Sequence, residues 1–353
     1  MRLTLQKNKL TFLLLFIGSF FIALIGESVL PEKFFYDAKT IVFDYYNEAG
    51  FKGSYPIAMS FYKYTQLGKL PFNVVGVIQL FFYYFILYKI GIPKDFHILT
   101  IKNIVMYSAF FMVAIFIAMP SKEFITFLYV SQIVFLFQSR KIGFDISLLY
   151  SFFSLVLFGV FFRSYFALIP FISIILFYFS KIKYPNRTLA ILSVSILIIV
   201  IFSGLHYIVK GDFFSDLARN LVNDLREGSP DANSMIIPPL ETTGVFSEFI
   251  NTFYSFFSVN FPIVEYKHLL SPRIVMFIIW QILFTIILVV RFSWAIKDQK
   301  KNNRVLWVFY FLFSYLAIQS VFEPDLGSAV RHKIGILPLI YFVFYYDSFS
   351  KKI

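Results

Sequence analysis

About ten long apolar runs, separated by polar segments, constrain the fold of this chain more than any other feature of its sequence. A transmembrane helix needs about 20 apolar residues to cross about 30 Å of hydrocarbon. Several runs are shorter than that and are expected to extend into their flanks. The sequence therefore predicts an all-α integral membrane protein, a bundle of about ten transmembrane helices. The predicted spans are residues 10–25, 71–90, 104–119, 124–137, 146–162, 164–180, 188–209, 274–290, 305–322 and 334–346.

Composition excludes an ordinary soluble fold. Hydrophobic residues make up 59% of the chain and charged residues 15%, whereas soluble domains carry about 25% charged residues. Because lipid solvates the apolar surface, one polytopic membrane domain accounts for residues 1–353. The chain has no cysteine, which excludes disulfides, a thiolate nucleophile and a cysteine-based metal site. No cofactor is expected.

The distribution of positive charge predicts the orientation. With the N-terminus inside, 18 Lys and Arg lie on the inner side: three in the N-terminal tail, 13 in the inner loops and two at the C-terminus. The short loops on the other side hold only Lys122, Arg163, Arg331 and Lys333. By the positive-inside rule the chain is N-in and C-in. This division accounts for the net charge of +12 without a nucleic-acid partner.

Two longer segments, about residues 26–70 and 210–273, fall on the outer side. The first combines many Tyr and Phe with Asp37, Lys39, Asp44 and Lys63, which suits a carbohydrate and equally the membrane interface. The second holds two amphipathic helical patterns, at residues 213–226 and 246–257. We expect the first to be an interfacial helix and the second to lie on the membrane surface or to re-enter the membrane.

Three short outer turns carry the remaining ionisable groups. They contain Lys122 with Glu123, then Arg163 with Tyr165, then residues 322–333. The 35 residues from 146 to 180 are too long for one crossing and are expected to fold back at Arg163. Ionisable groups at membrane depth are costly and are functional candidates. The alternative interpretation is structural: an ion pair, an arginine that reaches lipid phosphates, and a helix cap.

The last turn has the most specific pattern. Arg331, His332 and Lys333 are three successive basic residues at the predicted start of the final helix, where the helix dipole is positive and a polyanion is favoured. Arg163 and Arg331 can each donate two hydrogen bonds to a diphosphate. His332 could transfer a proton or serve as a further donor.

A basic pocket beneath amphipathic segments suits a lipid-linked diphosphate sugar, because guanidinium groups stabilise the charge that develops on a diphosphate leaving group. No metal site is predicted, and Glu323-x-Asp325 is only a weak cation candidate. The predicted binding residues are Arg163, Arg331, Lys333, Lys122, Arg219 and Tyr165. The candidate acid–base residues, which the sequence does not rank, are His332, Glu323, Asp325 and Glu123.

Two motifs resemble a known family. Phe-Arg-Ser-Tyr at residues 162–165 and Glu-Pro-Asp-Leu-Gly-Ser-Ala-Val-Arg-His-Lys at residues 323–333, with about ten spans and a large outer loop before the last three, resemble the Wzy-type O-antigen and capsule polymerases. The resemblance implies an inverting glycosyltransferase of the bacterial inner membrane that joins undecaprenyl-diphosphate-linked repeat units at the periplasmic face. It also implies no metal requirement, and a Wzx-type flippase and a Wzz-type chain-length regulator as partners.

Three other functions are compatible with such a chain. A lipid-linked oligosaccharide flippase should carry charges near the bilayer midplane and show internal duplication. A membrane acyltransferase should have a His or Ser site within the bundle, for which His206 is the only candidate. An O-antigen ligase would use the same basic pocket as a polymerase.

Overall fold

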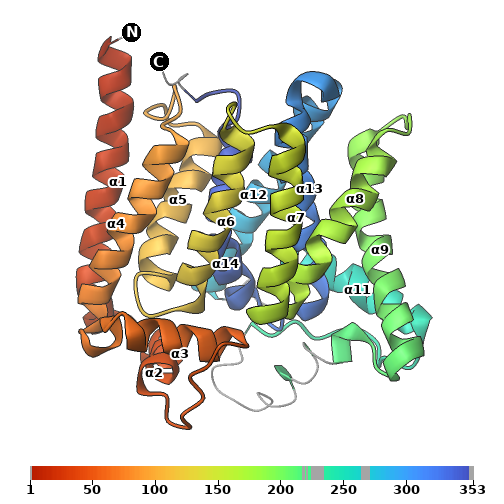
Figure 1. The fold of residues 1–353 in the computed structure, drawn as a ribbon, viewed down its shortest axis with the longest axis horizontal. Coiled ribbons are helices and arrows are strands. Elements are labelled where there is room, and N and C mark those ends of the chain that lie inside the picture. The colour runs from red at the N-terminus through yellow and green to blue at the C-terminus, as the bar shows by residue number, and fades with distance from the viewer. Residues whose placement is uncertain (1, 217–218, 220–221, 224–233, 264–270, 350–353) are drawn as a thin grey trace. The chain divides into compact units, whose positions relative to one another are not determined.

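The computed structural model describes residues 2–216, 219, 222–223, 234–263 and 271–349. These residues form helices joined by short connections, with no β-strand among them (Figure 1). The chain divides into two compact units. Residues 1–164 and 331–353 form the first unit, and residues 165–330 form the second.

In the first unit, α1 packs against α4 and α5, and α15 packs against α6, α4 and α5. Within this unit the start of α1 lies at one end of the helices, and α2 and α3 lie at the other (Figure 1). The segment predicted as a long outer loop therefore contains helices of its own. The elements are α1 (Arg2–Val29), η1 (Glu32–Phe35), α2 (Tyr36–Phe43), α3 (Ser54–Tyr64), η2 (Leu67–Lys69), α4 (Phe72–Ile90), α5 (Ile101–Phe116), α6 (Lys122–Gln138), α7 (Phe144–Phe161) and α15 (Leu337–Tyr345).

The second unit is built around α13, on which every residue from Leu306 to Val321 is buried. Helices α8, α9, α11 and α12 all pack against α13. The chain passes from one unit to the other twice, within η3 (Ser164–Ala167) after Ser164 and within α14 (Leu326–Gly335) after Val330. The other elements are α8 (Leu168–Ser180), α9 (Arg187–Lys210), α11 (Val245–Asn260), α12 (Pro272–Lys297) and α13 (Gln299–Phe322).

The helices are those of a membrane protein. Among the described residues, six are long and apolar enough to cross a bilayer: residues 6–29, 72–90, 144–161, 187–210, 274–297 and 299–322. Helices α14 and α15 together form a seventh candidate, bent by 70° between them. Residues 101–116 and 164–180 are apolar but shorter. The all-helical membrane class is confirmed, and a count of ten spans stays a prediction.

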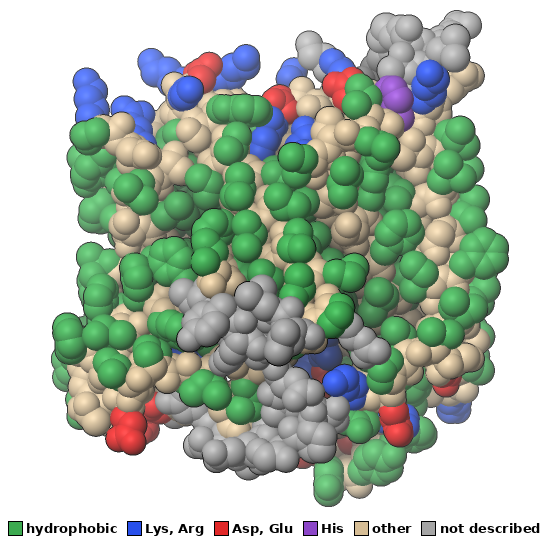
Figure 2. Space-filling model, turned by 180° about the vertical axis from the view of Figure 1, so that it is seen from behind, with side chains coloured by type: hydrophobic (Ala, Val, Ile, Leu, Met, Phe, Trp, Pro, Cys, Tyr) green, Lys and Arg blue, Asp and Glu red, His purple; other side chains and the backbone are tan. Residues whose placement is uncertain are grey.

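Hydrophobic side chains cover most of the visible surface of the helices, and Lys and Arg side chains gather at the helix ends (Figure 2). Phe81 and Phe85 on α4, Phe153 on α7 and Leu197 on α9, for example, are exposed. A soluble protein rarely exposes large contiguous apolar patches. The exposed surface is therefore suited to contact with lipid.

Side-chain caps define several helix ends. The side chains of Thr100, Ser121, Asn186 and Asp298 accept hydrogen bonds from backbone N–H groups in the first turns of α5, α6, α9 and α13, as N-cap residues do. The predicted break at Arg163 is confirmed, because α7 ends just before it and η3 begins just after it. The apolar segment of residues 146–180 is thus divided into two helical parts at Arg163.

Helix α11 confirms the second amphipathic pattern, but its polar side is the buried one. Glu248, Asn251 and Ser255 are buried in the second unit, while Phe246 and Phe253 are exposed. This orientation suits a helix that presents its apolar face to lipid. Most of the first pattern, residues 213–226, lies outside the described residues.

One local prediction is wrong. Arg331, His332 and Lys333 were expected at the start of the final helix, but α14 begins at Leu326 and places them near its end. Asp325 causes the earlier start, because its side chain accepts a hydrogen bond from the backbone N–H of Ser328 at 2.8 Å. The three basic residues therefore lie where the helix dipole favours them, and the dipole alone is no argument for a bound anion.

Close packing of α4 depends on Gly76. A Cβ atom at this position would overlap the carbonyl oxygen of Ala118 and lie 2.9 Å from its carbonyl carbon. We expect Gly76→Ala to lower the free energy of unfolding by about 1–3 kcal/mol, because neighbouring backbone must move. The measurement is thermal unfolding of the purified protein in detergent. Gly204→Ala on α9, where nothing lies within 4 Å of the added Cβ, is the control. Equal melting temperatures for the two variants would contradict this packing.

Candidate functional site

A buried carboxylate organises the charged residues of the first unit. Glu123, in the first turn of α6, is fully buried. Its Oε1 accepts a hydrogen bond from Nη2 of Arg163 at 2.7 Å and lies 3.4 Å from Nε2 of His332. Its Oε2 lies 3.4 Å from Nε of Arg331. Three basic side chains from two sequence-distant turns thus meet on one carboxylate.

Asp37 is the second acid of this group, and it lies on α2. Its Oδ1 accepts a hydrogen bond from the hydroxyl of Tyr55 at 2.6 Å. Its Oδ2 pairs with Nη2 of Arg331 and lies 3.4 Å from Nζ of Lys122. The Lys122 ammonium also lies 3.5 Å from the centre of the Tyr55 ring, a cation–π contact. We call these seven residues the charged cluster: Asp37, Tyr55, Lys122, Glu123, Arg163, Arg331 and His332.

Local structure holds Glu123 in place. Ser121 caps α6 with a hydrogen bond to the backbone N–H of Phe124. The hydroxyl of Tyr62 on α3 accepts from the backbone N–H of Ser121 at 2.9 Å. A Cβ added at Gly335 would lie 3.5 Å from the Cβ of Glu123, so the end of α14 passes close to this carboxylate. Three helices therefore fix the centre of the cluster.

The surrounding cations decide the ionisation of Glu123. Burial alone would raise the pKa of Glu123, but the charges of Arg163 and Lys122 and the hydrogen bond from His332 outweigh burial and hold the pKa below its usual range. Glu123 is therefore a carboxylate at neutral pH. A carboxylate with so low a pKa is a weak general base, because it has little affinity for a proton.

The more accessible members of the cluster are better suited to chemistry. The side chains of Asp37, Arg331 and His332 are 26%, 22% and 22% exposed, whereas that of Glu123 is fully buried. Burial raises the pKa of Tyr55 to about 12, so its hydroxyl remains a donor. Three permanent cations face two carboxylates, which leaves an excess of positive charge. Such a surface is suited to bind an anion through guanidinium donors.

Asp37 and Tyr55 were not among the site residues expected from the sequence. Asp37 lies in a segment with several other charged residues, and nothing in the sequence separates it from Asp44 or Glu48. The only sequence feature that pointed to this region was the combination of aromatic and charged residues within residues 26–70. Lys333 is buried in the same helical turn as His332.

The other expected site residues belong to the second unit and make local contacts there. Glu323 accepts hydrogen bonds from Gln319 at 3.0 Å and Ser328 at 2.5 Å, and Asp325 caps α14. Tyr165 stacks on Phe322 with ring centres 5.7 Å apart. These contacts give Glu323 and Asp325 structural roles, and a role of either as a base stays a prediction.

Arg219 is the centre of a second polar group, within the second unit. It is fully buried, and its Nη1 donates to Oγ of Ser255 and to the carbonyl of Ser320. Among the described residues its Nε and Nη2 have no hydrogen-bond partner. Burial lowers the pKa of Arg219 to about 10. Nearby Glu248 accepts hydrogen bonds from Ser203 and Ser215, each at 2.5 Å, and burial raises its pKa.

Within the part of the chain that the structure describes, no three His, Asp or Glu side chains gather in a way that would hold a metal ion. No family model matches this sequence, and neither a curated protein nor a solved structure matches it. The functional argument therefore depends on the residues of the charged cluster and on the membrane class of the fold.

Proposed function

We propose that this protein is a polysaccharide polymerase of the Wzy type, an inverting glycosyltransferase that joins undecaprenyl-diphosphate-linked oligosaccharide repeat units. The observation that carries the proposal is the pair of guanidinium groups, Arg163 and Arg331, held on the same buried carboxylate of Glu123. Both arginines come from the two motifs that resemble the polymerases. A rigid pair of guanidinium groups suits a diphosphate, which presents several oxygens at a fixed spacing.

In the proposed reaction, a hydroxyl of one repeat unit attacks the anomeric carbon of the growing chain on its lipid carrier. A new carbon–oxygen bond forms as the bond to the diphosphate breaks, with inversion at that carbon. The electron pair of the broken bond leaves with undecaprenyl diphosphate. Arg163 and Arg331 stabilise the charge that develops on this leaving group, and Lys122 adds to the positive field.

The attacking hydroxyl must lose a proton as it reacts. Asp37 and His332 are both partly exposed, but Asp37 already pairs with Arg331 and Lys122, so His332 is the better candidate for the base. His332 lies 3.4 Å from the Glu123 carboxylate, which would orient its ring, as carboxylates do in catalytic triads. Glu123 then has a positioning role.

The proposal also includes about ten spans, an N-in and C-in orientation in a bacterial inner membrane, and a periplasmic site. The placement of α2 and α3 at the end of the first unit opposite to the start of α1 supports the proposal that this end faces the periplasm (Figure 1). Asp37 and Tyr55 of the charged cluster come from those two helices. A Wzx-type flippase and a Wzz-type regulator would be its partners.

The test is a reconstituted reaction. The purified protein in lipid nanodiscs is incubated with undecaprenyl-diphosphate-linked repeat units extracted from a deletion strain, and the products are separated on a gel and weighed by mass spectrometry. We expect chains of increasing repeat number and release of undecaprenyl diphosphate.

The same reaction distinguishes the other candidates. Extension that requires lipid A core as acceptor would indicate a ligase, and addition of an acyl mass to an unchanged repeat unit would indicate an acyltransferase. Movement of the unchanged lipid across a vesicle membrane, without a new glycosidic bond, would indicate a flippase. Each of these results would replace the polymerase proposal.

A further inference from the structure

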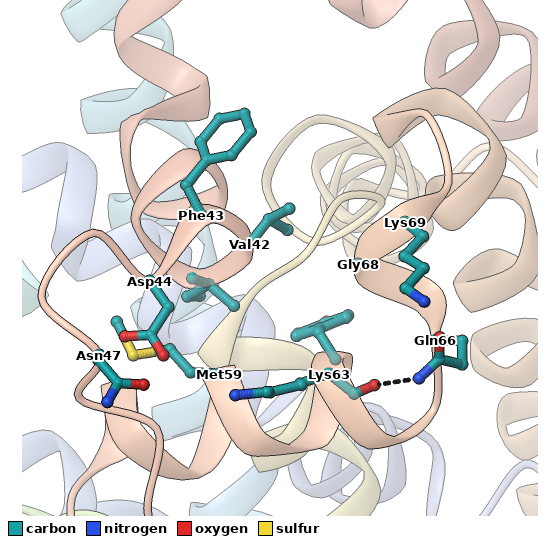
Figure 3. A pocket seen from close by; sticks show the side chains of 11 residues that line it. Val42, Phe43, Asp44, Asn47, Met59, Lys63, Gln66, Gly68 and Lys69 are labelled. Atoms are coloured by element: carbon teal, nitrogen blue, oxygen red, sulfur yellow. Dashed lines mark hydrogen bonds between the residues drawn. The ribbon is translucent and has the colours of Figure 1, made fainter.

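A polar pocket lies on the first unit, apart from the charged cluster. It has a volume of about 510 Å³ and opens between the end of α2 and the end of α3 with η2 (Figure 3). Pockets of about 300–1,000 Å³ are of the size that holds small ligands. This one is therefore large enough for one or two sugar rings.

The lining of the pocket has an apolar floor and a polar rim. Ile41, Met59 and Tyr62 form part of the floor and are buried. On the rim, Lys63 and Lys69 have no ion pair or side-chain hydrogen bond to any described residue. The view of Figure 3 places these two lysines on separate sides of the opening. A sugar ring has the same division, with an apolar face and polar edges.

Two amides add directional hydrogen bonding at the rim. The Asn47 side chain makes no hydrogen bond to a described residue, and Gln66 uses only its Nε2, which donates to the carbonyl of Lys63 at 2.8 Å. Asp44 is committed, because its carboxylate accepts from the backbone N–H groups of Glu48 and Ala49. The groups left for a ligand are two ammonium ions, one amide and one amide oxygen. The two ammonium ions outnumber the one carboxylate, Asp44, so the lining has a formal net charge of +1 and favours a polar ligand with a negative charge.

The backbone around the pocket is strained. Asp44, Asn47 and Gln66 have φ angles of 42°, 53° and 60°, and they are the non-glycine residues with positive φ in the described part of the chain. All three line this pocket. Left-handed backbone is unfavourable for residues other than glycine and gathers at ligand-binding sites.

We propose that this pocket binds an acidic sugar residue of an oligosaccharide. The proposal rests on the proposed function in one respect: the oligosaccharide is the substrate that reacts at the charged cluster. Lys63 and Lys69 bind the carboxylate or other acidic group, and Asn47 and Gln66 bind hydroxyl groups. The ring lies against the apolar floor.

The pocket and the charged cluster share the same two helices. Asp37 and Asp44 are seven residues apart in sequence on α2 and at its C-cap, a rise of about 10 Å. Tyr55 and Lys63 lie eight residues apart on α3, a rise of about 12 Å. Tyr62 lines the floor of the pocket, and its hydroxyl accepts a hydrogen bond from the backbone N–H of Ser121, which precedes Lys122 of the cluster. An oligosaccharide of a few residues can therefore extend from the reacting end to the pocket.

The experiment measures binding of free glycans, without lipid or diphosphate, so that it does not depend on catalysis. The detergent-solubilised full chain is applied to an array of bacterial glycans of defined structure, neutral and acidic. We expect retention of acidic glycans, and a loss of affinity of at least about tenfold in the double variant Lys63→Ala/Lys69→Ala. Lys52→Ala, which removes an exposed lysine outside the pocket lining, is the matched control.

Retention of no acidic glycan, or equal retention by wild type and the double variant, would overturn the pocket assignment. A loss of binding to vesicles of anionic phospholipid in the double variant, with no glycan retained, would make the pocket a lipid headgroup site and would also overturn it. Glycan binding by a protein that fails to polymerise repeat units would leave the pocket standing and refute the proposed function instead.

Discussion

Replacing Arg163 by alanine is expected to reduce the host's surface polysaccharide from a ladder of long chains to single repeat units. The guanidinium group of Arg163 is proposed to stabilise the departing diphosphate, and removal of one such preorganised donor lowers a rate by about 100- to 1,000-fold. Arg331→Ala should have a similar effect, since both arginines contact Glu123. The measurement is gel separation of the polysaccharide from a deletion strain that carries each variant.

Arg163→Lys and Arg331→Lys keep the charge but lose the paired donors of the guanidinium group. We expect these variants to make chains with fewer repeat units than the wild type but more than one. Arg140→Ala removes an exposed arginine elsewhere in the first unit and should leave the ladder unchanged. The amount of each protein is measured by immunoblot, and a lysine variant replaces any alanine variant whose level falls. A full ladder from Arg163→Ala at normal protein level would refute the diphosphate role.

Replacing Glu123 by glutamine is expected to destabilise the protein by about 3–5 kcal/mol, because removal of one member of a buried ion pair leaves the other charge uncompensated. Glu123 is fully buried and faces Arg163, Arg331 and His332. Thermal unfolding of the purified variant in detergent measures the loss. We also expect no polymerisation by this variant, since the arginines lose their common anchor.

A matched variant and a double variant separate the charge effect from general damage. Glu48→Gln changes an exposed glutamate of the same unit and should shift stability by less than about 0.5 kcal/mol. In the double variant Glu123→Gln/Arg163→Gln, the loss should be smaller than the sum of the two single losses, because both partners of the pair are removed. Additive losses would show that the two side chains do not interact.

The charged cluster combines two roles that are usually in conflict. In the proposed function its cations bind an anion, but several cations close together in a membrane protein repel one another and lose hydration. Glu123, which is fully buried, and Asp37, which is partly exposed, offset this cost through their ion pairs with Arg163 and Arg331. The two carboxylates do not cancel all the positive charge of Lys122, Arg163 and Arg331, and in the proposed function a polyanionic substrate completes the neutralisation.

Most of the helices could be predicted from sequence, because an apolar run forms a helix in lipid whatever its neighbours are. The position of the break at Arg163 followed from the same argument, as a charge ends an apolar run. The start of α14 could not be predicted in this way. It depends on a hydrogen bond from the backbone of Ser328 to Asp325, which the predicted span at residues 334–346 did not include.

The sequence by itself determined that this chain is a helical membrane protein, and it identified Lys122, Glu123, Arg163, Arg331 and His332 as charges in otherwise apolar surroundings. Only the tertiary structure decided that these residues meet, and that Asp37 and Tyr55 join them. The physical reason is that an ion pair depends on distance in space, and Asp37 and Arg331 are 294 residues apart in the chain. Hydropathy marks where a charge is costly, but the packing of α2, α3, α6 and α14 determines which opposite charge offsets that cost.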